Sequence, residues 1–299
     1  MSQSIKVHIA LFTVSFIYAI TYSLVKDIMP HYIQGFGLII IRVIGASILF
    51  LSASYFFPRE KIDWKNHGWR LFFCSVFGVV ANMLMFFKGL EITSPINGAV
   101  LMLASPIFVL ILNTFVNKQS LLLVQVLGII LACFGCLVLM MGKSFSFSSA
   151  TLPGDILILL NAMSFASFLV LSKNLLQHYK PITVAKYTFL IGSVLVIPFG
   201  YSELMEAKFS EMDLIIVLEI LFIIVCTTFV TFLLNAWAVS KAGPTIVGAY
   251  IYLQPVLATI LAIFLKKDVL NMHKILALLL IFAGVYITSN KNKWYKSKV

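Results

Sequence analysis

Ten long apolar stretches dominate this chain of 299 residues and decide what it can fold into. A helix rises about 1.5 Å per residue, so roughly 20 mostly apolar residues cross a hydrocarbon core about 30 Å thick. Barrel strands would be shorter and would alternate in polarity, which these stretches do not. The sequence predicts an all-α integral membrane protein with ten transmembrane helices, at approximately 7–25, 35–57, 69–89, 95–116, 121–141, 153–173, 182–201, 213–238, 245–265 and 272–289.

The few charged residues indicate how the chain lies in the membrane. They make up only 11% of the sequence, whereas soluble domains carry about 25%. The net charge of +11 does not indicate a nucleic-acid partner, because Lys and Arg lie in short loops and tails. If the N-terminus is cytoplasmic, fourteen of them fall on the cytoplasmic side and seven on the other, and Arg42 falls within a stretch. The positive-inside rule then predicts that both termini are cytoplasmic. We expect a multi-pass protein of a bacterial inner membrane.

The second half of the chain repeats the first. At an offset of 149 residues Pro106 aligns with Pro255, and at the front of each half an offset of 147 aligns Ala19 with Ala166. Each half holds five stretches, and an odd number of crossings forces the second copy into the opposite orientation. We therefore predict two inverted five-helix repeats, 1–146 and 147–299, the second of which ends in a basic cytoplasmic tail. Such repeats suit alternating access around a site near the midplane.

Prolines and polar side chains within the stretches indicate where that site lies. Pro106 and Pro255 lack an N–H, so we predict helix kinks there, and kinked backbone in a membrane faces protein or a wet cavity. Polar side chains mark the helix face that avoids lipid, although they also join helices at about 0.6 kcal/mol per contact, and both interpretations remain open. The candidate residues of the substrate cavity are Tyr22, Asn82, Ser105, Asn161, Thr231, Asn235, Tyr250 and Gln254.

Charged and reactive residues limit the possible chemistry. Arg42, Lys26 and Lys88 are candidate charged contacts, although the long stem of Arg42 could also carry its charge to the interface or pair it within the protein. No acidic residue lies at the centre of a stretch, so ion coupling has no candidate residue. Metalloprotease, serine-hydrolase and P-loop signatures are absent as well, and the sequence predicts no enzyme, no metal and no cofactor.

Two strings carry a resemblance to a known family: "FFKGLEITSPINGAVLMLASPIFVLILNTF" in the first half and "YLQPVLATILA" in the second. The prolines at 95, 106, 244 and 255 and Arg42 early in the second stretch match the same family pattern. Nearly the whole chain thus resembles the EamA-type transporters of the drug/metabolite transporter superfamily. Two features depart from that pattern. Tyr18-Ala19 stands where the family often has Trp-Gly, and Asn117-Lys118 and Lys266-Lys267 stand where it often has Gly-Glu.

The resemblance implies a secondary transporter of small organic solutes, often an exporter, with a central cavity between the repeats. We expect an exporter of metabolites such as amino acids or drug-like solutes. The alternative is a lipid or lipid-linked sugar translocase of the same fold, which a convergence of Lys26 and Lys88 at one rim would favour. The expected partners are a small-molecule solute and the lipid bilayer. The solute, the direction, the coupling ion and the oligomeric state stay open.

Overall fold

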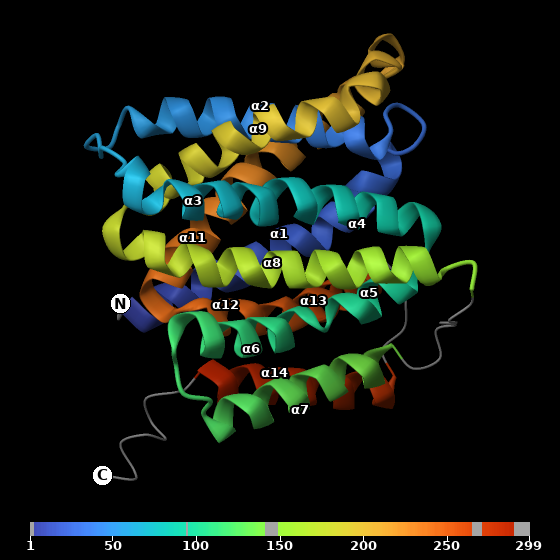
Figure 1. The fold of residues 1–299 in the computed structure, drawn as a ribbon. Coiled ribbons are helices and arrows are strands. Elements are labelled where there is room, and N and C mark those ends of the chain that lie inside the picture. The colour runs from blue at the N-terminus through green and yellow to red at the C-terminus, as the bar shows by residue number, and fades with distance from the viewer. Residues whose placement is uncertain (1–2, 94, 141–148, 265–270, 290–299) are drawn as a thin grey trace.

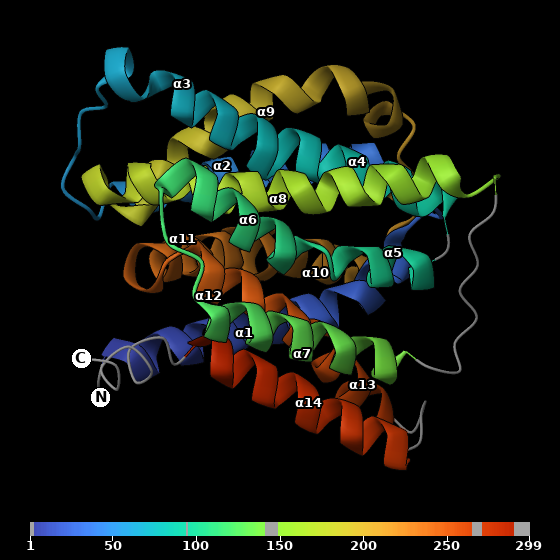
Figure 2. The ribbon, with the colours of Figure 1, turned by 60° about the horizontal axis from the view of Figure 1, so that its bottom comes forward.

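The protein is a bundle of long helices in a computed structural model, which describes residues 3–93, 95–140, 149–264 and 271–289 (Figures 1 and 2). Nine helical spans within these residues are long and apolar enough to cross a membrane, and Leu123–Leu139 is a shorter apolar helix. The predicted all-α, multi-pass membrane fold is confirmed. The boundary expected at 146/147 and the basic tail expected after residue 289 lie outside the described residues.

Each half of the chain contributes five spans. The spans of the first half are α1 (Gln3–Ile28), α2 (Gly35–Ser54), α3 with η1 and α4 (Trp64–Ser75, Val76–Val80, Ala81–Ile92), α5 with α6 (Pro95–Met102, Ser105–Asn117) and α7 (Leu123–Leu139). Those of the second half are α8 (Leu152–His178), α9 (Pro181–Met205), α10 with η3 and α11 (Leu214–Phe222, Ile223–Val230, Thr231–Ala242), α12 with η4 and α13 (Pro244–Ala249, Tyr250–Tyr252, Leu253–Phe264) and α14 (Met272–Ser289). A short 3₁₀ helix, η2 (Phe209–Glu211), precedes α10.

The third span of each half begins and changes pitch in the same way. Asp63 caps α3 by accepting a hydrogen bond from the N–H of Asn66, and Asp213 caps α10 by accepting one from the N–H of Ile216. Such caps satisfy N–H groups that have no partner within the helix. Both spans then pass through a π-helical segment, η1 in the first half and η3 in the second. The two-repeat organisation is therefore visible in individual caps and turns.

The fourth span of each half is broken at equivalent positions. The first break is a turn at Leu103–Ala104, and the second is the 3₁₀ segment η4. Pro106 is the second residue of α6 and Pro255 the third residue of α13, so each proline lies in the first turn of a new helix. N–H groups in a first turn have no intrahelical acceptor, so the missing proline N–H removes no bond there. The span is thus divided into two helices rather than bent along one.

The outer pairs of helices pack most closely. α7 lies against α14 on one side of the bundle, and α2 lies against α9 on the opposite side (Figure 1). A Cβ atom built on Gly284 would lie 2.5 Å from the carbonyl oxygen of Gly128, which shows that the backbones of α14 and α7 touch. Small residues allow such close approach between membrane helices.

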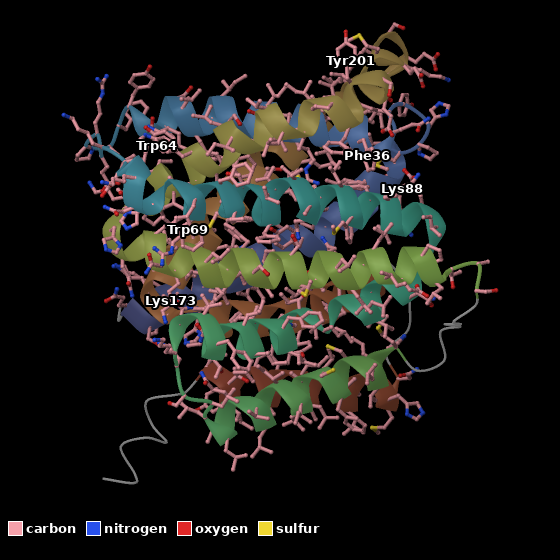
Figure 3. All side chains as sticks on the ribbon, in the orientation of Figure 1. Phe36, Trp64, Trp69, Lys88, Lys173 and Tyr201 are labelled. Carbon is pink, nitrogen blue, oxygen red and sulfur yellow. The ribbon has the colours of Figure 1, made fainter. Side chains whose placement is uncertain are left out.

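Aromatic and basic side chains gather at the two ends of the bundle. Trp64, Trp69 and Lys173 lie toward one end, and Lys88 and Tyr201 lie toward the other (Figure 3). Aromatic side chains favour the two membrane–water interfaces, where an apolar ring and a polar edge are both accommodated. The long axis of the helices therefore corresponds to the membrane normal, and the middle of the bundle corresponds to the midplane.

Candidate solute-binding site

The two broken spans meet each other inside the bundle. Tyr252 and Leu103 occupy equivalent positions, 149 residues apart, and the buried hydroxyl of Tyr252 donates to the carbonyl of Leu103 at 3.1 Å. The Sγ of Cys136 donates to the carbonyl of Tyr252 at 3.6 Å, and the hydroxyl of Ser15 donates to the backbone carbonyl of Tyr250 at 3.0 Å. Carbonyls at the breaks thus find partners in α1, in α7 and in the other half of the chain.

The π-helical segments also place side chains at their irregular carbonyls. In η3 the hydroxyl of Thr228 donates to the carbonyl of Ile223 at 2.7 Å, and in η1 the hydroxyl of Ser164, from α8, donates to the carbonyl of Phe77 at 2.8 Å. Single π turns inside α-helices are frequent at functional sites. Here they lie in the middle of the third span of each half, and α1 and α2 pack on η3.

Hydroxyl groups meet where α1 packs on η3. The hydroxyls of Thr21 and Thr227 lie 2.7 Å apart, and those of Tyr18 and Thr231 lie 3.3 Å apart. Tyr22 belongs to the same helix, but its side chain lies outside the described residues. Together with a cation from α2 these residues form what we call the central polar cluster: Tyr18, Thr21, Arg42, Thr227, Thr228 and Thr231.

Arg42 supplies the cation of this cluster. Its side chain is 9% exposed, and its Nε donates to the hydroxyl of Thr228 at 3.2 Å. Thr228 lies fourteen residues from either end of the span Leu214–Ala242, near the midplane. The guanidinium therefore does not reach the interface along its stem, as the sequence allowed, but points into the bundle.

The other two candidate charged contacts lie elsewhere. Lys26 is exposed in the last turn of α1, and Lys88 is exposed in α4, where its Nζ forms an ion pair with Glu91 at 2.7 Å. The other ion pair among the described residues joins Lys208 to Glu211 at 3.5 Å, also on the surface. The central polar cluster therefore contains one cation.

Two of the candidates, one from each half, lie at the contact between α4 and α8. The Nδ2 of Asn161 donates to the backbone carbonyl of Asn82 at 2.5 Å, so these two residues are brought together. The Oδ1 of Asn161 is buried and has no hydrogen-bond partner among the described residues. Leaving a buried amide oxygen without a hydrogen bond costs free energy, and a donor on a bound solute would recover that cost. The Oδ1 of Asn161 is therefore an acceptor available to a solute.

The remaining candidates are dispersed around the two broken spans. The hydroxyl of Tyr250 lies 2.7 Å from Nδ1 of His8, and the hydroxyl of Ser105 is buried without a partner among the described residues. Asn235 is buried in α11, and Gln254 is half-buried at the start of α13. The predicted residues thus divide among several places rather than lining one described cavity.

A buried carboxylate near one end of the bundle is a residue that sequence reasoning missed. Asp155 is 3% exposed in the first turn of α8 and accepts from the hydroxyl of Thr93 at 2.5 Å. The Nδ2 of Asn97 and the hydroxyl of Thr151 lie 3.4 Å from its carboxylate oxygens. These contacts join α8 to the connection between α4 and α5. The signal was present in the polar residues that flank Pro95, in "TSPIN".

An equivalent polar contact closes the other end. The Nδ2 of Asn113, in α6, donates to the hydroxyl of Thr245, in α12, and to the Oε1 of Gln119, both at 3.2 Å. The Nδ2 of Asn117 donates to the carbonyl of Val170 in α8 at 3.3 Å. Each end of the bundle therefore has its own set of polar bonds between the broken spans and their neighbours.

Two hollows open beside α11. One, of about 190 Å³, lies beside the α11–α12 connection and is lined by residues that include Lys173, Lys241 and Gly243. The other, of about 380 Å³, is a mainly apolar groove between α1 and α11, lined by Lys6, Ile9, Ala10, Thr13, Leu234 and Trp237. Neither hollow is lined by the central polar cluster, whose side chains are packed against one another.

Known proteins are similar to this chain in sequence or in fold. An uncharacterized transporter of Archaeoglobus fulgidus is 26% identical over 96% of this chain and 98% of its own length, and the S-adenosylmethionine uptake transporter of Rickettsia prowazekii is 22% identical over 95% and 94%. A protein of known crystal structure superposes with a TM-score of 0.81 at 15% identity, over 97% of this chain and 98% of that one, which shows the fold. The model of the EamA-like transporter family matches twice, over residues 5–141 and 152–290. The chain therefore belongs to the EamA-like transporter family, within the drug/metabolite transporter superfamily, and is a membrane transporter rather than an enzyme.

Proposed function

We propose that the protein exports small organic metabolites, such as amino acids or drug-like solutes, by alternating access between its two repeats. The contact between Tyr252 and Leu103 carries this proposal. It joins equivalent positions of the two broken spans, so the halves can exchange conformations about a point that both share. A single rigid pore would not need matched breaks in the two copies.

The polar contacts at the two ends supply the gates that this mechanism requires. At one end Asp155 holds the α4–α5 connection, and at the other Asn113 holds α12. Either set can open without disturbing the other, because they lie at opposite ends of the bundle and involve different connections. In this scheme, solute enters when one set opens, contacts the midplane residues, and leaves when the other opens.

We place the protein in the inner membrane of a bacterial cell, with both termini in the cytoplasm. The excess of Lys and Arg in alternate loops supports this orientation, since cytoplasmic loops carry such an excess. The relative from Rickettsia prowazekii is named for the uptake of S-adenosylmethionine, which supports a small organic solute. Export rests on the family resemblance.

The test is metabolite profiling of spent medium from cells making equal amounts of wild type, Gln254→Leu or Gln125→Leu. Gln254 is half-buried in the second broken span, whereas Gln125 is buried in α7, which packs against α14. We expect one or more solutes to be enriched outside cells with wild type and with Gln125→Leu, but less so with Gln254→Leu. The same solute concentrations in the medium of all cells, together with the same rates of solute uptake, would contradict the proposal.

Lipid translocation is the second candidate, and the groove between α1 and α11 favours it. This groove is mainly apolar and has one cationic residue, Lys6, which suits an acyl chain with an anionic headgroup. Lys26 and Lys88, whose convergence would have supported this function, are both exposed, and Lys88 is paired with Glu91. Movement of a fluorescent phospholipid across vesicles containing the protein, without solute export, would establish this function instead.

A further inference from the structure

Arg42 is a buried cation near the midplane, and no acidic side chain among the described residues forms an ion pair with it. The two ion pairs of the described part lie on the surface. The only hydrogen bond from its guanidinium to a described residue runs from Nε to the neutral hydroxyl of Thr228. A charge inside a membrane is expensive and is found where it pairs with a partner or serves a transport pathway. Arg42 thus has no anionic partner among the described residues, and its charge is available to a bound anion.

The packing of the fold does not require this cation. At the offset of 147 residues Arg42 aligns with Phe189, and the same offset aligns Gly45 with Gly192 in the same two helices. Phe189 is fully buried, and its ring lies 4.7 Å from that of Phe232, centroid to centroid. The second half thus places an apolar ring at the position equivalent to Arg42. An arginine here serves something other than helix packing.

The surroundings of the guanidinium define the group that it can bind. Its two terminal nitrogens remain as parallel donors, the fork that carboxylates and phosphates match. The neighbouring side chains of the central polar cluster are hydroxyls, which can accept or donate but carry no charge. One cation balances one negative charge, which fits a carboxylate better than a phosphate monoester with nearly two.

We propose that Arg42 binds the carboxylate of the transported solute, so that the solutes of this protein are organic acids, including amino acids. This inference rests on the proposed transport function and deepens it. The cluster contains no carboxylate to receive an ammonium group, so the carboxylate, and not the amine of an amino acid, decides which solutes bind. Hydroxyls of Tyr18 and Thr231 lie beside the site and complete the hydrogen bonds of the solute.

The test uses the purified full-length protein in vesicles loaded with a low-molecular-weight cell extract, with the membrane potential clamped by potassium and valinomycin. Mass spectrometry of the released solutes compares wild type, Arg42→Lys, Arg42→Gln and Arg59→Gln with protein-free vesicles. Arg59 is exposed between α2 and α3, so its substitution makes the same change in charge away from the cluster. Each solute that wild type releases is then compared with its carboxamide.

We expect every solute that wild type releases faster than protein-free vesicles to carry a carboxylate. Its carboxamide should leave about tenfold more slowly or worse, because the neutral carboxamide loses the ion pair and its NH2 group cannot accept from the second N–H of the guanidinium fork. Arg42→Gln should lose the release, Arg42→Lys should retain part of it, and Arg59→Gln should match wild type. Because the comparison of acid with carboxamide uses wild type, it stands even if Arg42→Gln fails to fold.

Several results would overturn the inference, and those that concern Arg42 are distinguishable from failure of the proposed function. If wild type releases solutes without a carboxylate, or carboxamides as fast as acids, or if a monodisperse Arg42→Gln releases acids at the wild-type rate, the role of Arg42 is wrong and transport stands. Preference for phosphate esters would replace the carboxylate by a phosphate and equally overturn the solute class. If no solute leaves faster than from protein-free vesicles, the proposed function fails and the inference fails with it.

Discussion

The two halves of the molecule build the same seam from opposite kinds of side chain. Where α1 packs on η3 in the central polar cluster, the hydroxyls of Thr21 and Thr227 lie 2.7 Å apart. At the repeat offsets these residues align with Phe168 and Gly78, and there the ring of Phe168 lies so close that a Cβ on Gly78 would be 2.6 Å from it. One seam joins hydroxyls and a guanidinium, whereas in the other a phenylalanine ring packs on a bare backbone beside the hydrogen bond from Ser164 to the carbonyl of Phe77.

This difference separates what the fold needs from what the function uses. Both seams pack α-helices against a π-helical segment, and both are buried, so neither polarity nor aromaticity is demanded by the architecture. Burying polar groups is costly unless they are bonded. The hydroxyls of the polar seam are bonded, but the charge of Arg42 has no counter-charge among the described residues. That charge is a cost which the aromatic seam avoids, and binding of an anionic solute would offset it.

The largest effect is expected when the cation is moved to the aromatic seam. Phe189→Arg places a charge among the rings of Phe50 and Phe232, where no described side chain can pair with it. We expect it to lower the free energy of unfolding by about 3 kcal/mol or more, as an unpaired buried charge does. The midpoint of unfolding in detergent measures this, and Phe189→Leu, which keeps the site apolar, is the control. A midpoint equal to that of the control would show that the aromatic seam also accepts a charge.

A smaller loss is expected when a methyl group is added under Phe168. In Gly78→Ala the new Cβ must displace the ring, because the nearest ring carbon lies 2.6 Å away, and overpacking costs about 1–3 kcal/mol. Gly68→Ala is the matched control. The nearest atom to a Cβ there is 3.4 Å away, in Trp64, so alanine should be neutral or stabilising. Unfolding midpoints that fall equally in both variants would contradict the close packing of the aromatic seam.

Sequence reasoning predicted the spans and the repeat well, because twenty-residue apolar stretches and residues matched at a fixed offset can be recognised along the chain without any knowledge of side-chain contacts. It predicted the site only in part. Asn82 and Asn161 were chosen as isolated amides and do meet, but Thr21 and Thr228 were missed. A lone threonine in an apolar helix carries no signal of its own, and the contacts of these two arise from how α1 and α2 lie on η3. The direction of Arg42 was open for the same reason.

An intermediate loss is expected when the partner of Arg42 is removed. Thr228→Val keeps the shape of the side chain but leaves Nε of Arg42 without its acceptor and the carbonyl of Ile223 without its donor. We expect a decrease of about 1.5 kcal/mol in the free energy of unfolding, the lower range for a hydrogen bond to a charged group. Val79→Thr, at the equivalent position of the first half, tests whether a hydroxyl alone stabilises that seam. If Thr228→Val unfolds at the wild-type midpoint, the bond to Arg42 does not hold the cation in place.

The smallest effect concerns the hydroxyl pair of the polar seam. A double-mutant cycle of Thr21→Val and Thr227→Val should give a coupling energy of about 0.6 kcal/mol, the average for polar contacts between membrane helices. Unfolding of the two single variants and the double variant in the same detergent measures it, and Thr13→Val, whose hydroxyl bonds only its own helix, controls for the loss of a hydroxyl. A coupling above about 2 kcal/mol would mean that the pair is kept for stability. A small coupling means that the fold gains little from these hydroxyls, as its twin seam already shows with Phe168 and Gly78, so their value lies in what they bind rather than in what they join.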